Sequence, residues 1–179
     1  MATKREQKRA LGKHTSWETT EGASRALHRS MTWPMRLPDE HLNAHLVGIA
    51  STHNEVTPCN AGIEPLVEQV KRGVFAAQGT PFVFGTITVS DAISMNTVGM
   101  KGSLVSREVI ADSVELTMRG HCYDALVGLA GCDKSLPGLM MVLLRLNVPS
   151  VFIYGGSILP GNYKGKDVTI VDVFEGVGK

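Results

Sequence analysis

The sequence predicts an α/β fold in which a mostly parallel sheet is flanked by helices, in the order β-α-β-α-β-α-β. Two observations lead to this prediction. Short apolar runs rich in β-branched and aromatic residues alternate with stretches whose apolar residues recur at helical spacing, and this alternation is typical of parallel sheets covered by helices. The chain of 179 residues, 43% of them hydrophobic and 20% charged, is also long enough to bury the core of one globular domain.

The first 44 residues do not follow this pattern. They are polar, contain Pro34 and Pro38, and show no sustained periodicity. We therefore expect residues 1–44 to form an irregular N-terminal arm, with one short helix near residues 22–31. Residues 45–179 follow as a single α/β domain.

The domain is predicted to open with two strands and a helix between them. Residues 46–51 are a short apolar run of strand type. In residues 63–77 the apolar positions recur at helical spacing, and Gly79-Thr80-Pro81 ends this helix. Residues 82–88 are rich in Phe, Val and Ile and form the second strand.

A second helix is expected to begin at Ser106. Serine is a favourable N-cap, and Glu108 would lie in the positively polarised first turn. Ile110, Val114 and Met118 then give this helix one apolar face.

The remaining sequence repeats the strand–helix alternation. Residues 124–130 are the predicted third strand and residues 149–154 the fourth. A helix between them would start at Ser135 or Pro137, because serine caps helices and proline suits the first turn. Residues 167–179 look like the start of one further element.

Composition and charge exclude several classes of protein. A formal net charge of +1 gives no field that would attract nucleic acid or an anionic membrane, so neither is expected as a partner. No apolar run approaches the roughly 20 residues of a membrane span, and residues 1–11 lack the apolar core of a secretory signal. Three cysteines are an odd number, unlike a disulfide framework. A cytoplasmic protein with thiols free to bind metal is therefore expected.

Five reactive side chains follow the predicted strands. The carboxyl ends of parallel strands share one edge of a sheet, which is where ligands bind in open α/β folds. These side chains should therefore converge at that edge. They are Cys59, Asp91, Cys132, Asp133 and Lys134.

Their chemistry suggests a metal site with two kinds of ligand. Cys59 and Cys132 are soft ligands, and thiols at helix N-termini, whose pKa is often lowered, bind soft metals or iron–sulfur clusters. Asp91 and Asp133 are hard oxygen donors of the kind that Mg²⁺ prefers. Lys134 would act as a base if desolvated, or as a ligand if modified to an acid.

A purely structural interpretation remains open for the turn at residues 132–134, with Cys132 as a core residue and Asp133 as a helix cap. Cys122 precedes a strand at the opposite edge and is expected to be a small buried residue outside the site. His53 and His121 are also left out, because a lone histidine in a loop is more often solvated than a ligand. Gly155-Gly156-Ser157 is only a weak phosphate-binding signal.

Several longer motifs follow one another along the chain. They are NEVTPCN at 54–60, VSD at 89–91, GMKGSL at 99–104, SREVIADS at 106–113, GCDK at 131–134, RLNVP at 145–149 and YGG at 154–156. In this order and spacing they resemble the dihydroxy-acid dehydratase family, which also includes sugar-acid dehydratases. The resemblance runs from about residue 20 to the last residue.

The resemblance implies a hydro-lyase that removes water from a 2,3-dihydroxy carboxylic acid to give a 2-keto acid, on the route to valine and isoleucine. It implies a [2Fe-2S] cluster held by three cysteines, two of which match Cys59 and Cys132. It also implies Mg²⁺ held by residues that match Asp91, Asp133 and Lys134, with Lys134 carried as a carbamate and counted as catalytic. A sugar-acid dehydratase and an inactive metal-binding fragment are the alternatives.

The family's third cysteine, a metal-binding glutamate and the serine base lie in later sequence. The resemblance thus implies that residues 45–179 are an incomplete cluster- and Mg-binding domain, inactive alone, of a protein that is a homodimer at full length. The chain departs from the family at Ala92, Asn96 and Val105, where Gly, Gly and Pro are usual. Ala92 would strain a turn that needs a positive φ, and Val105 would lose a preset φ before a helix start.

Overall fold

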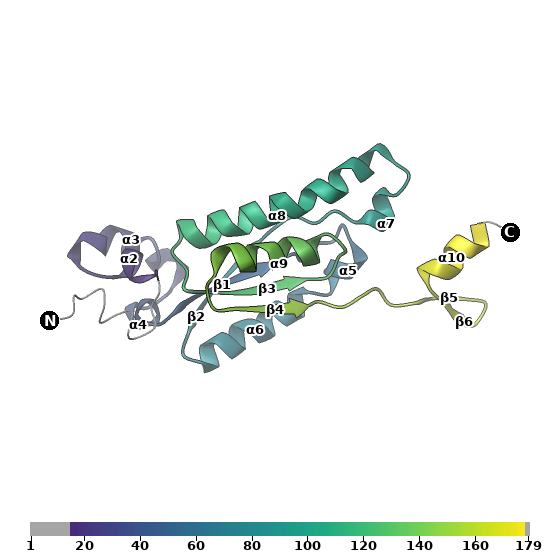
Figure 1. Ribbon diagram of the computed structural model, residues 1–179. Coiled ribbons are helices and arrows are strands. Elements are labelled where there is room, and N and C mark those ends of the chain that lie inside the picture. Colours follow the sequence, from purple (N-terminus) through teal and green to yellow (C-terminus); the bar gives the residue numbers. More distant parts are fainter. Residues whose placement is uncertain (1–14, 178–179) are drawn as a thin grey trace.

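The computed structural model describes residues 15–177 and contains one four-stranded sheet at its centre (Figure 1). All three strand pairings are parallel, in the order β2-β1-β3-β4, which confirms the predicted fold class. The first strand in sequence thus lies inside the sheet. The strands are β1 (Leu46–Ser51), β2 (Thr80–Gly85), β3 (Ala125–Ala130) and β4 (Ser150–Tyr154).

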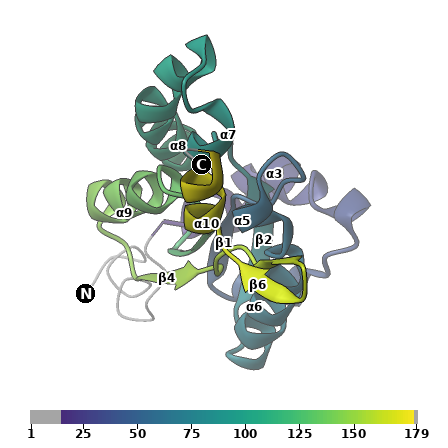
Figure 2. The same ribbon diagram turned by 90° about the vertical axis from the view of Figure 1, so that its right-hand side faces the viewer.

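Helices cover both faces of this sheet. Helix α6 (Glu64–Ala76) lies on one face, and α8 (Lys101–Gly120) and α9 (Ser135–Leu146) lie together on the other (Figures 1 and 2). Successive strand residues point to opposite faces, so each strand serves both layers. Ile49 and Leu129 pack with α6, whereas their neighbours Ala50 and Ala130 pack with α8 and α9.

One strand differs slightly from the prediction at both of its ends. β2 begins at Thr80 and ends at Gly85, so it includes Thr80 and Pro81, which were expected to lie in the break between the preceding helix and the strand. Proline lacks the N–H that a central strand needs, and it is tolerated here because β2 is an edge strand.

The start of α8 was predicted wrongly. The helix begins at Lys101 rather than at Ser106, which lies buried inside it and donates its Oγ hydrogen to the Ser103 carbonyl over 2.6 Å. The N-terminal signal is Thr97, whose side chain accepts a hydrogen bond from the Gly99 N–H and opens the 3₁₀ turn η3 (Val98–Met100) that leads into the helix. By contrast, α9 does begin at Ser135 as predicted, with Pro137 in its first turn.

The N-terminal arm is more ordered than expected. The short helix predicted near residues 22–31 is present as α3, but it is one of several, because elements of one or two turns are too short to show a periodicity. Residues 1–14 of the predicted arm lie outside the described part of the chain. The elements are α2 (Trp17–Thr20), η1 (Ala23–Arg25), α3 (Ala26–Ser30), η2 (Trp33–Met35) and α4 (Asp39–Asn43).

The chain after β4 leaves the body of the molecule (Figure 1). It forms an antiparallel hairpin of β5 (Gly161–Tyr163) and β6 (Lys166–Val168), followed by α10 (Ile170–Val177). Only one further element was predicted here. The hairpin was missed because its turn residues, Lys164 and Gly165, both have positive φ, and Lys-Gly is a weaker turn signal than Asn-Gly or Asp-Gly.

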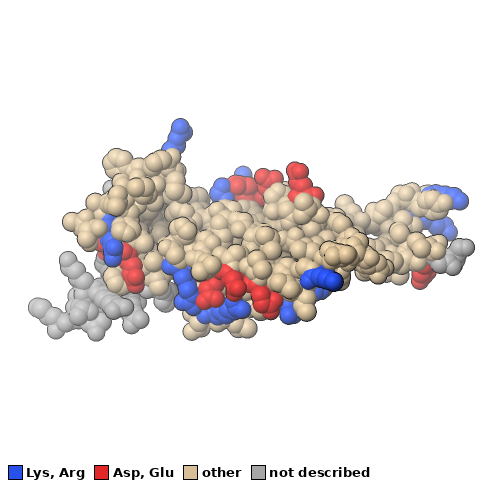
Figure 3. Space-filling model, turned by 90° about the horizontal axis from the view of Figure 1, so that it is seen from above, with Lys and Arg blue, Asp and Glu red and all other residues tan. Residues whose placement is uncertain are grey.

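The surface of the helix layer carries charges of both signs. Viewed onto α8 and α9, basic and acidic side chains occur in small groups separated by wide uncharged areas (Figure 3). Within residues 15–177, no helix combines the length and the apolar character needed to cross a membrane.

Candidate functional site

The five predicted side chains come from three loops at the carboxyl ends of β1, β2 and β3. Cys59 lies in the short helix α5 (Pro58–Ala61) that follows β1, and Asp91 is the first residue of α7 (Asp91–Ser94), which follows β2. Cys132, Asp133 and Lys134 lie between β3 and α9. The structure thus brings the three loops to one edge of the sheet, as the topology of parallel strands requires.

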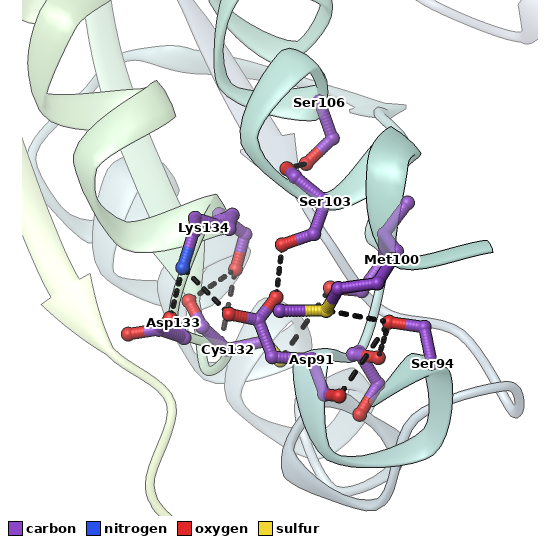
Figure 4. A network of polar contacts seen from close by, with 11 residues as sticks. Asp91, Ser94, Met100, Ser103, Ser106, Cys132, Asp133 and Lys134 are labelled. Atoms are coloured by element: carbon purple, nitrogen blue, oxygen red, sulfur yellow. Dashed lines mark hydrogen bonds and ion pairs between the residues drawn. The ribbon is translucent and has the colours of Figure 1, made fainter. Parts of the chain in front are cut away.

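Lys134 is the centre of a polar cluster (Figure 4). Its Nζ donates to Oδ2 of Asp91 over 2.6 Å and also contacts the carboxylate of Asp133. The other carboxylate oxygen of Asp91 accepts a hydrogen bond from the Ser103 hydroxyl. The side chains of Asp91 and Lys134 are about one-fifth exposed (19% and 20%), whereas that of Asp133 is 65% exposed. The cluster is therefore sheltered on the Asp91 side and open to solvent on the Asp133 side.

The charges in this cluster stabilise one another. Partial burial would raise the pKa of Asp91, but the hydrogen bonds from Lys134 and Ser103 outweigh it and hold that pKa below its usual value. Hydrogen bonds to Asp133 and Asp91 raise the pKa of Lys134. The ammonium form is therefore favoured, and Lys134 is a poor base in this arrangement.

The two thiols also approach each other. Cys132 is 5% exposed, and its Sγ lies 3.9 Å from the carbonyl oxygen of Val89 in the loop after β2. Burial raises the pKa of the Cys132 thiol and outweighs the backbone hydrogen bond from Asp133, which lowers that pKa, and the nearby Cys59 thiol raises it further. The lowered thiol pKa expected at a helix N-terminus is thus wrong for Cys132, because burial outweighs the effect of the adjacent helix.

Cys122 lies away from this pair, as predicted. It precedes β3 at the opposite end of the sheet, where its Sγ is 3.6 Å from the Arg119 carbonyl oxygen. It is partly exposed rather than buried, and its φ of 56° places it in the left-handed region.

The other residues weighed in the sequence have structural explanations. His53 contacts the Asn60 carbonyl and lies 3.8 Å from Glu64, and His121 stacks on Tyr123. A Cβ on Gly155 would lie 2.7 Å from Cγ1 of Ile63, so close packing alone explains this glycine.

Two of the three departures from the family motif cause no strain. Ala92 lies within α7 and does not have the positive φ for which its methyl group would be unfavourable. Val105 lies inside α8, so no preset φ is needed there. Asn96 has a φ of 59°, and asparagine tolerates this left-handed conformation better than most residues.

Sequence reasoning missed Ser103 as part of the site. It lies on the first turn of α8, twelve residues after Asp91, and reaches that carboxylate only because α8 starts earlier than predicted. The one available signal was its position inside the GMKGSL motif at residues 99–104.

The donor atoms fit the two kinds of metal group, but only in part. Cys59 is near enough to raise the pKa of the Cys132 thiol, and two carboxylates converge on a single positive charge at Lys134, so the carboxylates are close enough to share a cation. Among residues 15–177, no three His, Cys, Asp or Glu side chains gather closely enough to hold a metal ion by themselves. Each ligand set would need Lys134 or further donors to be complete.

Comparison with known proteins gives consistent matches. The family model described as dihydroxy-acid/6-phosphogluconate dehydratase N-terminal matches residues 45–179. The dihydroxy-acid dehydratase of Parvibaculum lavamentivorans is 64% identical over 164 residues, which are 92% of this chain and 28% of that protein. Those of Pelagibacter ubique and Natronomonas pharaonis are 63% and 56% identical, over 92% and 91% of this chain and 29% and 28% of their own lengths. The chain thus spans somewhat more than a quarter of the length of these relatives.

Proposed function

Because the chain belongs to the dihydroxy-acid/6-phosphogluconate dehydratase family, whose N-terminal model covers residues 45–179, we propose that it carries the cofactor-binding part of a hydro-lyase. The proposed reaction removes water from 2,3-dihydroxy-3-methyl carboxylic acids, such as 2,3-dihydroxyisovalerate, and gives 2-keto acids for valine and isoleucine synthesis. The relatives that match most of this chain are named dihydroxy-acid dehydratases, which supports this substrate class over sugar acids.

One observation carries the proposal. Two carboxylates, from loops that are far apart in sequence, meet the ammonium group of Lys134 at the carboxyl edge of the sheet, and at the same edge Cys59 lies near enough to raise the pKa of the Cys132 thiol. A purely structural role does not require soft sulfur and hard oxygen donors next to each other. A reaction that must activate a poor leaving group and also stabilise negative charge can use both kinds.

We propose that Cys59 and Cys132 hold a [2Fe-2S] cluster and that Asp91, Asp133 and Lys134, the last as a carbamate, hold Mg²⁺. When bound, these groups would act as Lewis acids, with iron acting on the departing hydroxyl and Mg²⁺ on the substrate oxygens that gain negative charge. Ser103 would keep the Asp91 carboxylate oriented toward the site by donating to its second oxygen.

Lys134 has a specific part in this proposal. As an ammonium it pairs with both Asp91 and Asp133 and offsets one of their two negative charges, which favours the arrangement seen here. As a carbamate it would carry negative charge beside two carboxylates, and such a set would need a divalent cation to be stable. Binding of Mg²⁺ and modification of Lys134 are therefore expected to depend on each other.

A segment exchange tests the function directly. The part of the Parvibaculum lavamentivorans dehydratase that aligns with this chain is replaced by this chain, and the chimera is loaded anaerobically with iron, sulfide and Mg²⁺. It is expected to form 2-keto acid from 2,3-dihydroxyisovalerate. Asp133→Asn in the chimera should abolish turnover but leave the absorbance of the cluster, whereas Cys132→Ser should reduce that absorbance.

Asp112→Asn is the matched control, because Asp112 is an exposed aspartate on α8 that pairs with Arg145. This control chimera should keep its activity. A loaded chimera that turns over sugar acids instead would assign the chain to the sugar-acid branch of the family. A chimera that binds the cluster but turns over neither substrate would refute the proposed reaction.

A further inference from the structure

Asn60, the residue after Cys59, is the most connected buried side chain near the thiols. It is fully buried, and its amide nitrogen lies 2.8 Å from the Thr52 carbonyl oxygen, 2.9 Å from Thr52 Oγ1 and 3.0 Å from Thr88 Oγ1. Thr52 directly follows β1, and Thr88 lies in the loop between β2 and Asp91. One amide group therefore joins the turn that carries Cys59 to the start of its own loop after β1 and to the loop after β2.

Thr52 extends this connection to the third strand. Its backbone N–H and its hydroxyl both donate to the Leu129 carbonyl over 3.1 Å, at the end of β3. The Cys132 loop begins two residues later. Asn60 is thus linked, directly or through Thr52, to all three loops that carry the proposed ligands.

The backbones of the two thiol loops are also in close contact. A Cβ on Gly131 would lie 2.2 Å from the Cys59 carbonyl oxygen and 2.9 Å from Asn60 Oδ1, so only glycine allows this approach. Within the part of the chain that the structure describes, Asn60 Oδ1 is buried and accepts no hydrogen bond. The side chain of Asn60 therefore makes its hydrogen bonds through its amide nitrogen, and these bonds offset the cost of the unpaired acceptor.

We propose that Asn60 is a positioning residue that joins the loops after β1, β2 and β3 and thereby sets the spacing between the thiols of Cys59 and Cys132. The importance of this spacing for a cluster rests on the proposed function, but the spacing itself does not. The competing explanation is that Asn60 only adds stability. The two explanations make different predictions. If Asn60 positions the loops, substituting it should weaken arsenical binding by the thiol pair more than a substitution elsewhere that destabilises the protein equally.

The test measures the thiol pair without iron. Phenylarsine oxide binds tightly when two thiols reach the same arsenic atom, and an excess of a monothiol removes it from a single cysteine. The full chain carrying Cys122→Ser is the reference, so that only Cys59 and Cys132 can react. It is expected to retain one arsenical per chain.

Two variants of the reference weaken the network to different degrees. Asn60→Ala removes the amide, and Thr88→Val removes one acceptor while it preserves the shape of the side chain. Both are expected to weaken arsenical binding. For Asn60→Ala the affinity should fall about tenfold or more, and a tenfold loss corresponds to ~1.4 kcal/mol of binding free energy.

Ser16→Ala is the matched control, because Ser16 is equally buried and hydrogen-bonded but lies at the opposite end of the strands. It should lower the denaturation midpoint and leave arsenical binding unchanged.

Each outcome decides the question. Unchanged binding in Asn60→Ala and Thr88→Val, or an equal loss in Ser16→Ala, would overturn the positioning role. If circular dichroism shows that Asn60→Ala does not fold, Thr88→Val alone decides. A reference protein that fails to retain the arsenical would overturn both this role and the thiol part of the proposed function. The expected pattern together with a failure of the loaded chimera to assemble an iron–sulfur cluster would support the positioning role and refute the cluster.

Discussion

The hydroxyl of Ser16 donates a hydrogen bond of 2.6 Å to Oδ2 of Asp124, although 108 residues separate them in the sequence. The same carboxylate accepts the backbone N–H groups of Thr15, Ser16 and Leu46. It is buried, since Asp124 has 1% of its surface exposed. One side chain therefore fastens the N-terminal arm to the starts of β1 and β3, at the edge of the sheet opposite the thiols.

Asp124→Asn is expected to lower the free energy of unfolding by about 2–3 kcal/mol, measured by urea denaturation. The NH2 group that replaces one carboxylate oxygen in asparagine cannot accept a hydrogen bond, so at least one buried donor loses its partner. Asp112→Asn, at a side chain that is 62% exposed, should change stability by less than about 0.5 kcal/mol. Equal effects of the two substitutions would contradict the role given to Asp124.

The same carboxylate makes stability depend on pH. Burial would raise the pKa of Asp124, but hydrogen bonds from Ser16, Thr15 and Leu46 outweigh it and hold the pKa below the ordinary value of 3.8. The resulting stability is fully present above that value and is lost as the pH falls through the lower pKa of the folded state. Asp124→Asn should therefore flatten the loss of stability below about pH 4, as seen in urea midpoints measured across that range. A curve parallel to that of the parent chain would refute this.

Lys134→Met is expected to raise the pKa of Asp91 in the metal-free chain. The substitution removes a hydrogen bond and a positive charge that lower this pKa, whereas the burial that raises it remains. Carbon-13 NMR of the carboxyl groups would measure the change. Lys71→Met is the control, because Lys71 pairs with Glu68 on α6 and should leave Asp91 unaffected. An Asp91 pKa that is the same in all three proteins would show that Lys134 does not stabilise the carboxylate.

Gly131→Ala is expected to destabilise the protein by about 1–3 kcal/mol, because the added methyl group overlaps the Cys59 carbonyl and must displace α5. Gly73→Ala offers the opposite case. Gly73 lies inside α6, where an added Cβ meets no atom within 4 Å, so alanine should stabilise the helix by about 0.5–1 kcal/mol. Denaturation midpoints that move in the same direction for both would show that the close approach at Gly131 is not the cause.

The sequence was sufficient for the sheet because each strand is an apolar run bounded by turn residues, and parallel topology then places the loops after the strands at one edge. That reasoning alone brought Asp91 and Lys134 together. It was not sufficient for Ser103, whose contact with Asp91 depends on where α8 begins, and that start is fixed by the Thr97 turn rather than by the favourable cap at Ser106. It also missed Asn60, because a buried amide that joins three loops leaves no periodic pattern.

The position of β1 inside the sheet has a consequence for synthesis of the chain. β1 is made before both of its partners, β2 on one side and β3 on the other. The contact between Leu46 and Asp124 that marks the β3 side spans 78 residues. At translation rates of about 5–20 residues per second, one edge of this apolar strand waits roughly 4–16 s for its partner to leave the ribosome. During that interval β1 is a natural binding segment for chaperones that recognise extended apolar peptides.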